Sequence, residues 1–225
     1  MRERRFSNLF QQPASVEPKR TRWLYAGFTT AAAALLLFGW LANEVVHGQQ
    51  LRFDSVVRNT VHSWASPQLT YAMRGITQLG APWFLIAVSL IVIWKLIEHG
   101  RKRAAILLVV AAVGAEALDE LLKVIFHRTR PAPFFHYTEP LSYSFPSGHA
   151  ISSCCFYGIM AAIITARMKS SVGRVAVWVA AALMAGLIGF SRIYLGVHYP
   201  SDVVAGYAAA VVWVAALRAS LELWR

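Results

Sequence analysis

Residues 104–131 read AAILLVVAAVGAEALDELLKVIFHRTRP, and this stretch decides the class of fold. Its apolar part, residues 104–126, is long enough to cross the hydrocarbon core of a bilayer as an α-helix. Lys123 lies near the end of that run, and Arg130-Pro131 follow it directly. The stretch therefore predicts a membrane-spanning helix that brings cations to one surface of the membrane.

Five further apolar runs surround this one, at residues 23–42, 80–97, 149–166, 174–190 and 200–217. The chain is 57% hydrophobic, more than is usual for a soluble domain. In residues 43–79, Leu51, Val57 and Val61 lie among polar residues, which favours a short interfacial helix. We therefore expect an all-α membrane protein, with six transmembrane helices in a bundle and the interfacial helix between spans one and two.

The expected membrane domain covers residues 23–218, with a basic tail at residues 1–22 and a second tail at residues 219–225. Six spans place both tails on one side, and 15 of the 22 Lys and Arg residues then fall on that side. By the positive-inside rule, both tails are cytoplasmic. Because successive helices alternate in direction, the residues that follow spans three and five are expected at the opposite face. In the inner membrane of a bacterium that face is periplasmic.

The net charge of +11 is a feature of nucleic-acid-binding proteins as well as of membrane proteins. Here the basic residues fall between apolar runs and form no continuous basic face, so we expect no nucleic-acid partner. Cys154 and Cys155 are adjacent, and neighbouring residues on a helix point in different directions. They predict neither a disulfide framework nor a metal site. We expect no cofactor, and the sequence carries no signal for an oligomeric state.

Three short clusters place ionisable groups beside the apolar runs. Phosphoryl transfer requires cations around the phosphate oxygens, an in-line nucleophile and a proton for the leaving oxygen. Lys123, Arg130 and Arg192 are three such cations, and a guanidinium binds phosphate oxygens in a bidentate fork. Ser147-Gly148 comes just before the fourth run, where free backbone N–H groups at a helix start point at an anion.

His198 and Asp202 are four residues apart, at the start of the sixth run. If a helix begins near Pro200, the carboxylate can turn back and accept the proton of one ring nitrogen. The other nitrogen is then free to attack. His149 opens the fourth run on the same membrane face and is left to act as the general acid.

The clusters have a fixed order and spacing: Lys123, six residues, Arg130-Pro131; Pro146-Ser147-Gly148-His149; and Ser191-Arg192, five residues, His198, three residues, Asp202. This pattern resembles the three-part signature of the type-2 phosphatidic acid phosphatase superfamily, with no departure at the signature positions. The resemblance covers residues 75–218. Length and span number are similar to the bacterial branch that includes phosphatidylglycerophosphatase B and undecaprenyl diphosphate phosphatase.

The resemblance implies a metal-independent phosphatase in which His198 attacks phosphorus, Asp202 orients it and His149 protonates the leaving group. Water then hydrolyses the phosphohistidine. The phosphate would be held by Lys123, Arg130, Ser147, Gly148 and Arg192. The substrate would be a lipid phosphate or diphosphate of the bilayer, of the undecaprenyl diphosphate, phosphatidylglycerol phosphate or phosphatidic acid class.

Three alternatives remain open. A phosphotransferase would use the same phosphohistidine with another acceptor, a haloperoxidase would hold vanadate at the phosphate position, and a lipid transporter would only bind the headgroup. Embedding in the membrane disfavours the haloperoxidase, and a transporter has no need of the His198–Asp202 pair.

Two features near Lys123 have open interpretations. Three acids precede it, Glu116, Asp119 and Glu120, with Asp119 at helical i,i+4 spacing. They are buried acids satisfied by cations or neighbouring helices, groups that orient the lysine, or groups with a direct catalytic role. Arg128 is a candidate ligand for the second phosphate of a diphosphate.

Overall fold

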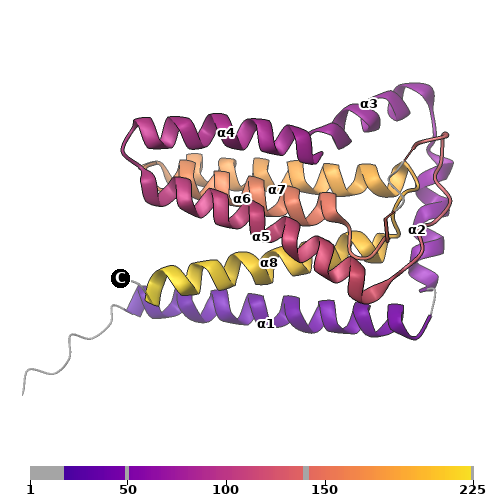
Figure 1. Ribbon diagram of the computed structural model, residues 1–225, viewed down its shortest axis with the longest axis horizontal. Helices are drawn as coiled ribbons and strands as arrows, with labels where there is room; N and C mark the ends of the chain where they lie inside the picture. The colour runs from indigo at the N-terminus through magenta and orange to yellow at the C-terminus, as the bar shows by residue number, and fades with distance from the viewer. Residues whose placement is uncertain (1–17, 49–50, 139–141, 224–225) are drawn as a thin grey trace, which may run out of the picture.

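The computed structural model describes residues 18–48, 51–138 and 142–223, and in these ranges it contains helices and no strand (Figure 1). The described helices are α1 (Pro18–Val46), α2 (Arg52–Ser63), α3 (Pro67–Gln78), α4 (Pro82–Glu98), α5 (Lys102–Phe126), α6 (Gly148–Thr165), α7 (Ser171–Tyr194) and α8 (Pro200–Leu223). The expectation of an all-α fold is confirmed for this part of the chain.

The long helices run side by side, and α2 lies across one end of the bundle (Figure 1). Helix α6 packs against α5, α7 and α8, while α1 packs along α8. The described start of α1 and the end of α8 lie together at the end of the bundle away from α2 (Figure 1). The turn between α7 and α8 lies at the α2 end.

Among the described residues, four helices are long and apolar enough to cross a membrane, namely α1, α6, α7 and α8. The pair α3 and α4 adds a fifth candidate span, bent by 47° at the break between its helices. Large apolar side chains on the outside of the bundle include Leu36, Trp83 and Ile106, each more than half exposed. Such a surface is stable against lipid tails and costly in water, so the chain is an integral membrane protein.

Helix α2 lies where the short interfacial helix was predicted, and it is followed by a second helix, α3, that was not predicted from the sequence. Pro67 has no N–H to continue α2 and is well suited to the first turn of a new helix. The hydroxyl of Ser66 accepts a hydrogen bond from the Leu69 N–H at 3.2 Å and caps that start.

The tail boundaries also differ from the predicted ones. Helix α1 begins at Pro18, within the predicted first tail, and α8 continues to Leu223, within the predicted second tail. The rest of the first tail, residues 1–17, lies outside the described residues, as do residues 224–225.

Small residues allow the close packing of the inner helices. A Cβ atom on Gly114 of α5 would collide with the Trp213 ring of α8. The indole Nε1 of Trp213 donates to the Ala111 carbonyl at 3.2 Å. Because α5 and α8 approach this closely, the residues at their site ends are held in a fixed relative position.

Candidate active site

The three sequence clusters meet at the α2 end of the bundle. Lys123 is on the last turn of α5, Ser147 precedes α6, and Arg192 is on the last turn of α7. The N–H of Ser147 donates to the Asp202 carbonyl at 3.0 Å, which ties the start of α6 to the start of α8. Residues from four helices and two loops therefore converge on one site.

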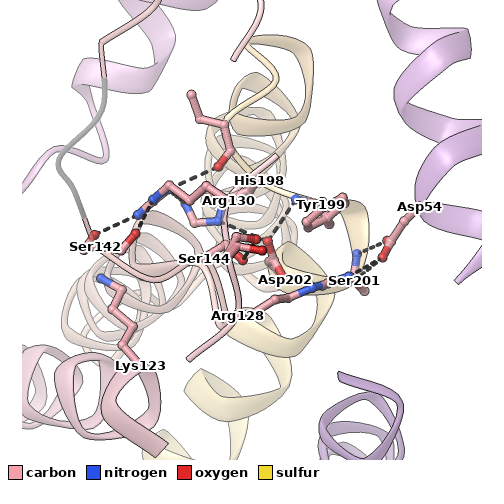
Figure 2. Close-up of polar contacts among 12 residues, drawn as sticks. Asp54, Lys123, Arg128, Arg130, Ser142, Ser144, His198, Tyr199, Ser201 and Asp202 are labelled. Atoms are coloured by element: carbon pink, nitrogen blue, oxygen red, sulfur yellow. Dashed lines mark hydrogen bonds and ion pairs between the residues drawn. The ribbon is translucent and has the colours of Figure 1, made fainter. Parts of the chain in front are cut away.

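His198 lies in the turn between α7 and α8 and is 2% exposed. Its Nε2 is 3.0 Å from Nη1 of Arg130, and its Nδ1 is 3.4 Å from Oδ2 of Asp202 (Figure 2). A guanidinium can only donate, so Nε2 accepts and the ring hydrogen of the neutral imidazole is on Nδ1. One ring nitrogen therefore faces the Asp202 carboxylate, and the other faces the Arg130 guanidinium.

Asp202 is fully buried and has a partner on each oxygen. Oδ2 also accepts the Tyr199 N–H at 2.9 Å, and Oδ1 accepts from Nη1 of Arg128 at 2.6 Å. These bonds leave the carboxylate one orientation, with Oδ2 toward the imidazole.

Arg130 is held by the loop on both sides of it. Its Nε donates to the Ser142 carbonyl at 2.8 Å, and its Nη2 donates to the Ser142 hydroxyl at 3.0 Å. Nη1 donates to the Val197 carbonyl at 3.1 Å in addition to the imidazole. The guanidinium is thus fixed directly beside Nε2 of His198.

Lys123 forms ion pairs with two of the acids that precede it. Of the interpretations open for these acids, the pairs favour buried acids that are satisfied by a cation. Its Nζ donates to Oδ2 of Asp119 at 2.5 Å and lies 3.7 Å from Oε1 of Glu120. Lys123 is 9% exposed and Asp119 is 3% exposed, so the pair is nearly dry. A buried cation without a counter-ion is costly, and Asp119 supplies the counter-ion while no anion is bound.

The start of α6 is packed against this ion pair. A Cβ atom on Gly148 would collide with the Asp119 carboxylate, so glycine is required for the close approach. The Ser147 side chain is fully buried, and its Oγ has no hydrogen-bond partner among the described residues. A buried hydroxyl in this state is a donor available to an anion.

Arg192 is 1% exposed, and its Nη1 donates to the Thr77 hydroxyl of α3 at 2.7 Å. Its guanidinium carbon is 5.7 Å from the centre of the Tyr137 ring. His149 is in the first turn of α6. Each sequence-predicted residue of the third cluster and His149 are therefore at the same end of the bundle as Lys123.

The electrostatics of His198 show that these groups face one another. Burial lowers the pKa of its imidazole well below 6.5, and the positive charges of Arg130, Arg192 and Lys123 lower that pKa further. The imidazole is therefore neutral at physiological pH and keeps a lone pair on Nε2. We call Lys123, Arg130 and Arg192 the cation cluster.

Arg128 differs from its sequence interpretation as a ligand for a second phosphate. Its Nη1 is bound to Asp202, and its Nη2 donates to Oδ2 of Asp54 at 2.9 Å. The guanidinium also lies over the Tyr199 ring, with its carbon 4.0 Å from the ring centre. With both ends of its fork bound to carboxylates, Arg128 is part of the support for Asp202.

Sequence reasoning missed two members of this support, Asp54 and Ser201. Asp54 shares one helix face with Val57 and Val61, at i, i+3 and i+7 spacing. An acid on the apolar stripe of a short helix was the signal that could have identified it. Ser201 carried no signal, because a serine beside Pro200 is common at a helix start.

Comparisons with known proteins agree with the signature and the fold. The family model of the PAP2 superfamily matches residues 104–224. Phosphatidylglycerophosphatase B from Bacillus subtilis is 29% identical over 183 residues, which is 80% of this chain and 89% of that protein. Undecaprenyl-diphosphatase from Sulfolobus acidocaldarius is 31% identical over 132 residues, which is 56% of this chain and 59% of that protein.

Among solved structures, the transmembrane PAP2-type phosphatidylglycerolphosphate phosphatase of Bacillus subtilis superposes with a TM-score of 0.77 at 27% identity. That match covers 87% of this chain and 98% of the other. LpxE from Aquifex aeolicus has the same fold, with a TM-score of 0.57 over 75% of this chain and 97% of that one. The family match, the shared fold and the converging signature residues lead to one assignment: this chain belongs to the PAP2 superfamily.

Proposed function

We propose that this protein is a metal-independent hydrolase that removes phosphate from membrane lipid phosphates or diphosphates through a phosphohistidine on His198. The observation that carries the proposal is the state of the His198 ring. Nε2 is an unprotonated nitrogen 3.0 Å from Arg130, and Nδ1 faces the buried carboxylate of Asp202. A nucleophile beside cations that bind phosphate oxygens is what in-line phosphoryl transfer requires.

In the first step, the Nε2 lone pair forms a bond to phosphorus while the bond from phosphorus to the lipid oxygen breaks. The cation cluster and the Ser147 hydroxyl take the charge on the three other oxygens. The imidazole becomes positively charged when the P–N bond forms, and Asp202 stabilises that charge through Nδ1–H. No metal is needed for this step, because the cations are side chains.

His149 transfers a proton in both steps of the reaction. It gives a proton to the departing lipid oxygen, so the lipid leaves as an alcohol or a shorter phosphate. Now unprotonated, it accepts a proton from the water that attacks phosphorus. The P–N bond breaks, inorganic phosphate is released, and the starting protonation states of His149 and His198 are restored.

The membrane arrangement is also part of the proposal. We count six spans, with the bent α3–α4 pair as one and α5 as another, and α2 as an interfacial helix at the site end. Helix α5 contains Glu116, Asp119, Glu120 and Lys123 in its second half, close to the site. With the basic tails cytoplasmic, the active site faces the periplasm.

A site at the end of a membrane bundle suits a substrate whose headgroup reaches the site while its tail stays in the bilayer. The names of the matched relatives refer to phosphatidylglycerophosphate and undecaprenyl diphosphate. We propose this class of lipid, phosphatidic acid included, as the substrate of this chain.

The test is phosphate release from a panel of lipid mono- and diphosphates by purified protein in one detergent, with EDTA present throughout. We expect release from at least one lipid, and none from His198→Ala. Phosphate that transfers from the lipid to histidine is trapped by rapid alkaline quenching, since phosphohistidine survives in base. The same panel is run without EDTA for comparison. Activity that is present without EDTA and fully lost with it, or wild-type turnover in His198→Ala, would refute the mechanism.

A further inference from the structure

Asp54 is a buried acid far from the signature. It is on α2, it is 0% exposed, and it lies outside residues 104–224 that match the family. Its Oδ1 accepts the Ser201 N–H at 2.8 Å, and its Oδ2 accepts the Ser201 hydroxyl at 2.6 Å. Oδ2 also accepts from Nη2 of Arg128 at 2.9 Å. A carboxylate removed from water and given three donors is a costly arrangement that needs a reason.

The donors lead directly to the proposed nucleophile (Figure 2). Arg128 uses its other terminal nitrogen to hold Oδ1 of Asp202 at 2.6 Å, and Asp202 faces Nδ1 of His198 with Oδ2. Ser201, the second contact of Asp54, is the residue before Asp202 in the first turn of α8. Asp54 therefore binds the Arg128 side chain and the Ser201 backbone, which together set the position of the Asp202 carboxylate.

The charges of Asp54, Arg128 and Asp202 also connect Asp54 to the proposed nucleophile. One guanidinium, that of Arg128, is shared between the carboxylates of Asp54 and Asp202, which leaves this group with one net negative charge. If Asp54 were neutral, Arg128 would pair with Asp202 alone and cancel its charge. A cancelled charge stabilises the positive imidazole of the phosphohistidine less well.

We infer that Asp54 is a positioning residue for His198: through Arg128 and Ser201 it holds the Asp202 carboxylate against Nδ1 and keeps the group negatively charged. The inference rests on the proposed phosphohistidine function. It gives α2, the helix that crosses the end of the bundle, a role in the chemistry. Removing a partner that orients an active group in this way commonly costs about 10- to 100-fold in activity.

The first test compares Asp54→Asn, which keeps the shape and removes the charge, with Val57→Ala on the same helix. Val57 packs in the apolar cluster beneath α2 and has no part in the ion pairs, so its truncation weakens docking of α2 only. We expect Asp54→Asn to lower kcat by about 10- to 100-fold while KM and vanadate affinity stay near wild type, because the cation cluster is untouched. Val57→Ala should keep the wild-type kcat per folded molecule.

The second measurement is independent of the substrate. In protein labelled with 15N-histidine, the Nδ1–H proton of His198, identified by its loss in His198→Ala, reports its hydrogen bond to Asp202. We expect this signal to shift in Asp54→Asn and to stay in place in Val57→Ala. If the wild-type protein releases no phosphate from any lipid, the proposed function fails, and this signal still decides the positioning role.

Two outcomes would overturn the inference: wild-type kcat and an unshifted Nδ1–H signal in Asp54→Asn, or an equal loss of kcat in Val57→Ala. If Asp54→Asn does not fold, Ser201→Ala replaces it. This substitution removes one of the three donors to Asp54 and the hydrogen bond from Nη1 of Arg128 to the Ser201 hydroxyl, and it leaves the ion pairs of Arg128. We then expect a smaller loss of kcat with a shift of the same signal. Wild-type values for both would again refute the role of Asp54.

Discussion

Arg130 and His198 share a hydrogen bond, with Nη1 of the guanidinium 3.0 Å from Nε2 of the imidazole. The cation thus occupies the lone pair that the proposed mechanism uses to attack phosphorus. When a phosphate enters, Arg130 has to exchange this bond for one to a phosphate oxygen, and Nε2 is released for attack at that moment. In the proposed mechanism, this one side chain would therefore couple binding of the substrate to exposure of the nucleophile.

The proposed role of His149 predicts a dependence on the leaving group. We expect His149→Ala to lower kcat on lipid phosphates by about 10²–10⁴-fold, the usual contribution of a general acid. With p-nitrophenyl phosphate, His149→Ala should lower the rate of the phosphorylation step by a smaller factor, because nitrophenolate leaves without a proton. Burst kinetics on the two substrates measure this, and equal losses on both would contradict the assignment.

The neutral state of His198 predicts a pH dependence. Burial first, and nearby cations second, hold the pKa of its imidazole well below 6.5. Falling pH protonates Nε2 and removes the lone pair, so single-turnover phosphorylation should be lost only when pH falls through that low pKa. A 15N titration of the His198 ring should have the same midpoint, below 6.5. A midpoint at or above this value would contradict the lowered pKa of the His198 imidazole.

The proposed phosphate contact of Arg192 predicts that an ammonium group binds vanadate less tightly than its guanidinium does. Arg192→Lys keeps the charge and loses the fork, so it should weaken vanadate binding by about 1.5–3 kcal/mol, or roughly 10- to 100-fold. Vanadate adopts the five-coordinate geometry of the transition state and is the suitable probe.

The matched control for this substitution is Arg74→Lys. Arg74 is an exposed arginine whose Nη2 donates to the Phe135 carbonyl at 2.8 Å. Its replacement should leave vanadate affinity unchanged. Tight vanadate binding in Arg192→Lys would refute bidentate recognition.

Two glycines of α6 predict opposite effects. A Cβ atom at Gly148 would collide with the Asp119 carboxylate, so Gly148→Ala should destabilise the protein by about 1–3 kcal/mol and disturb the Lys123–Asp119 pair. Apart from its chain neighbours and the adjacent backbone of α6, no described atom lies within 4 Å of a Cβ at Gly158, so Gly158→Ala should be neutral or stabilise by up to about 1 kcal/mol. Denaturation midpoints in detergent compare the two, and a stable, fully active Gly148→Ala would contradict the packing argument.

The long helices could be predicted because a helix in lipid satisfies its own backbone and needs only a long apolar run. The predicted run at residues 104–126 and the observed Lys102–Phe126 differ by two residues at the start. Residues 51–78 were harder, because amphipathic patterns are weaker and Ser66-Pro67 interrupts them. Helix α2 lies where a short helix was expected, whereas α3, which starts at Pro67 after the cap Ser66, was not predicted.

Some features of the candidate site could likewise be predicted from the sequence, and others could not. The order and spacing of Lys123, Arg130, His149, Arg192, His198 and Asp202 were sufficient to predict phosphate chemistry and a common membrane face. The i,i+4 pair of Lys123 and Asp119 was also visible, because one helix determines it. The partners of Arg128 were not, since Asp54 is 74 residues away in the chain.

The sequence by itself determined that this protein is a helical membrane protein with the signature residues of the PAP2 superfamily in their order, because hydropathy and motif spacing are local properties. Only the tertiary structure decided which charges meet. Arg128 turned out to bind Asp54 and Asp202 instead of lying open to a substrate, and Arg130 turned out to cover Nε2 of His198. Buried ion pairs of this kind form between distant segments, and they depend on packing that places both partners in the same dry space.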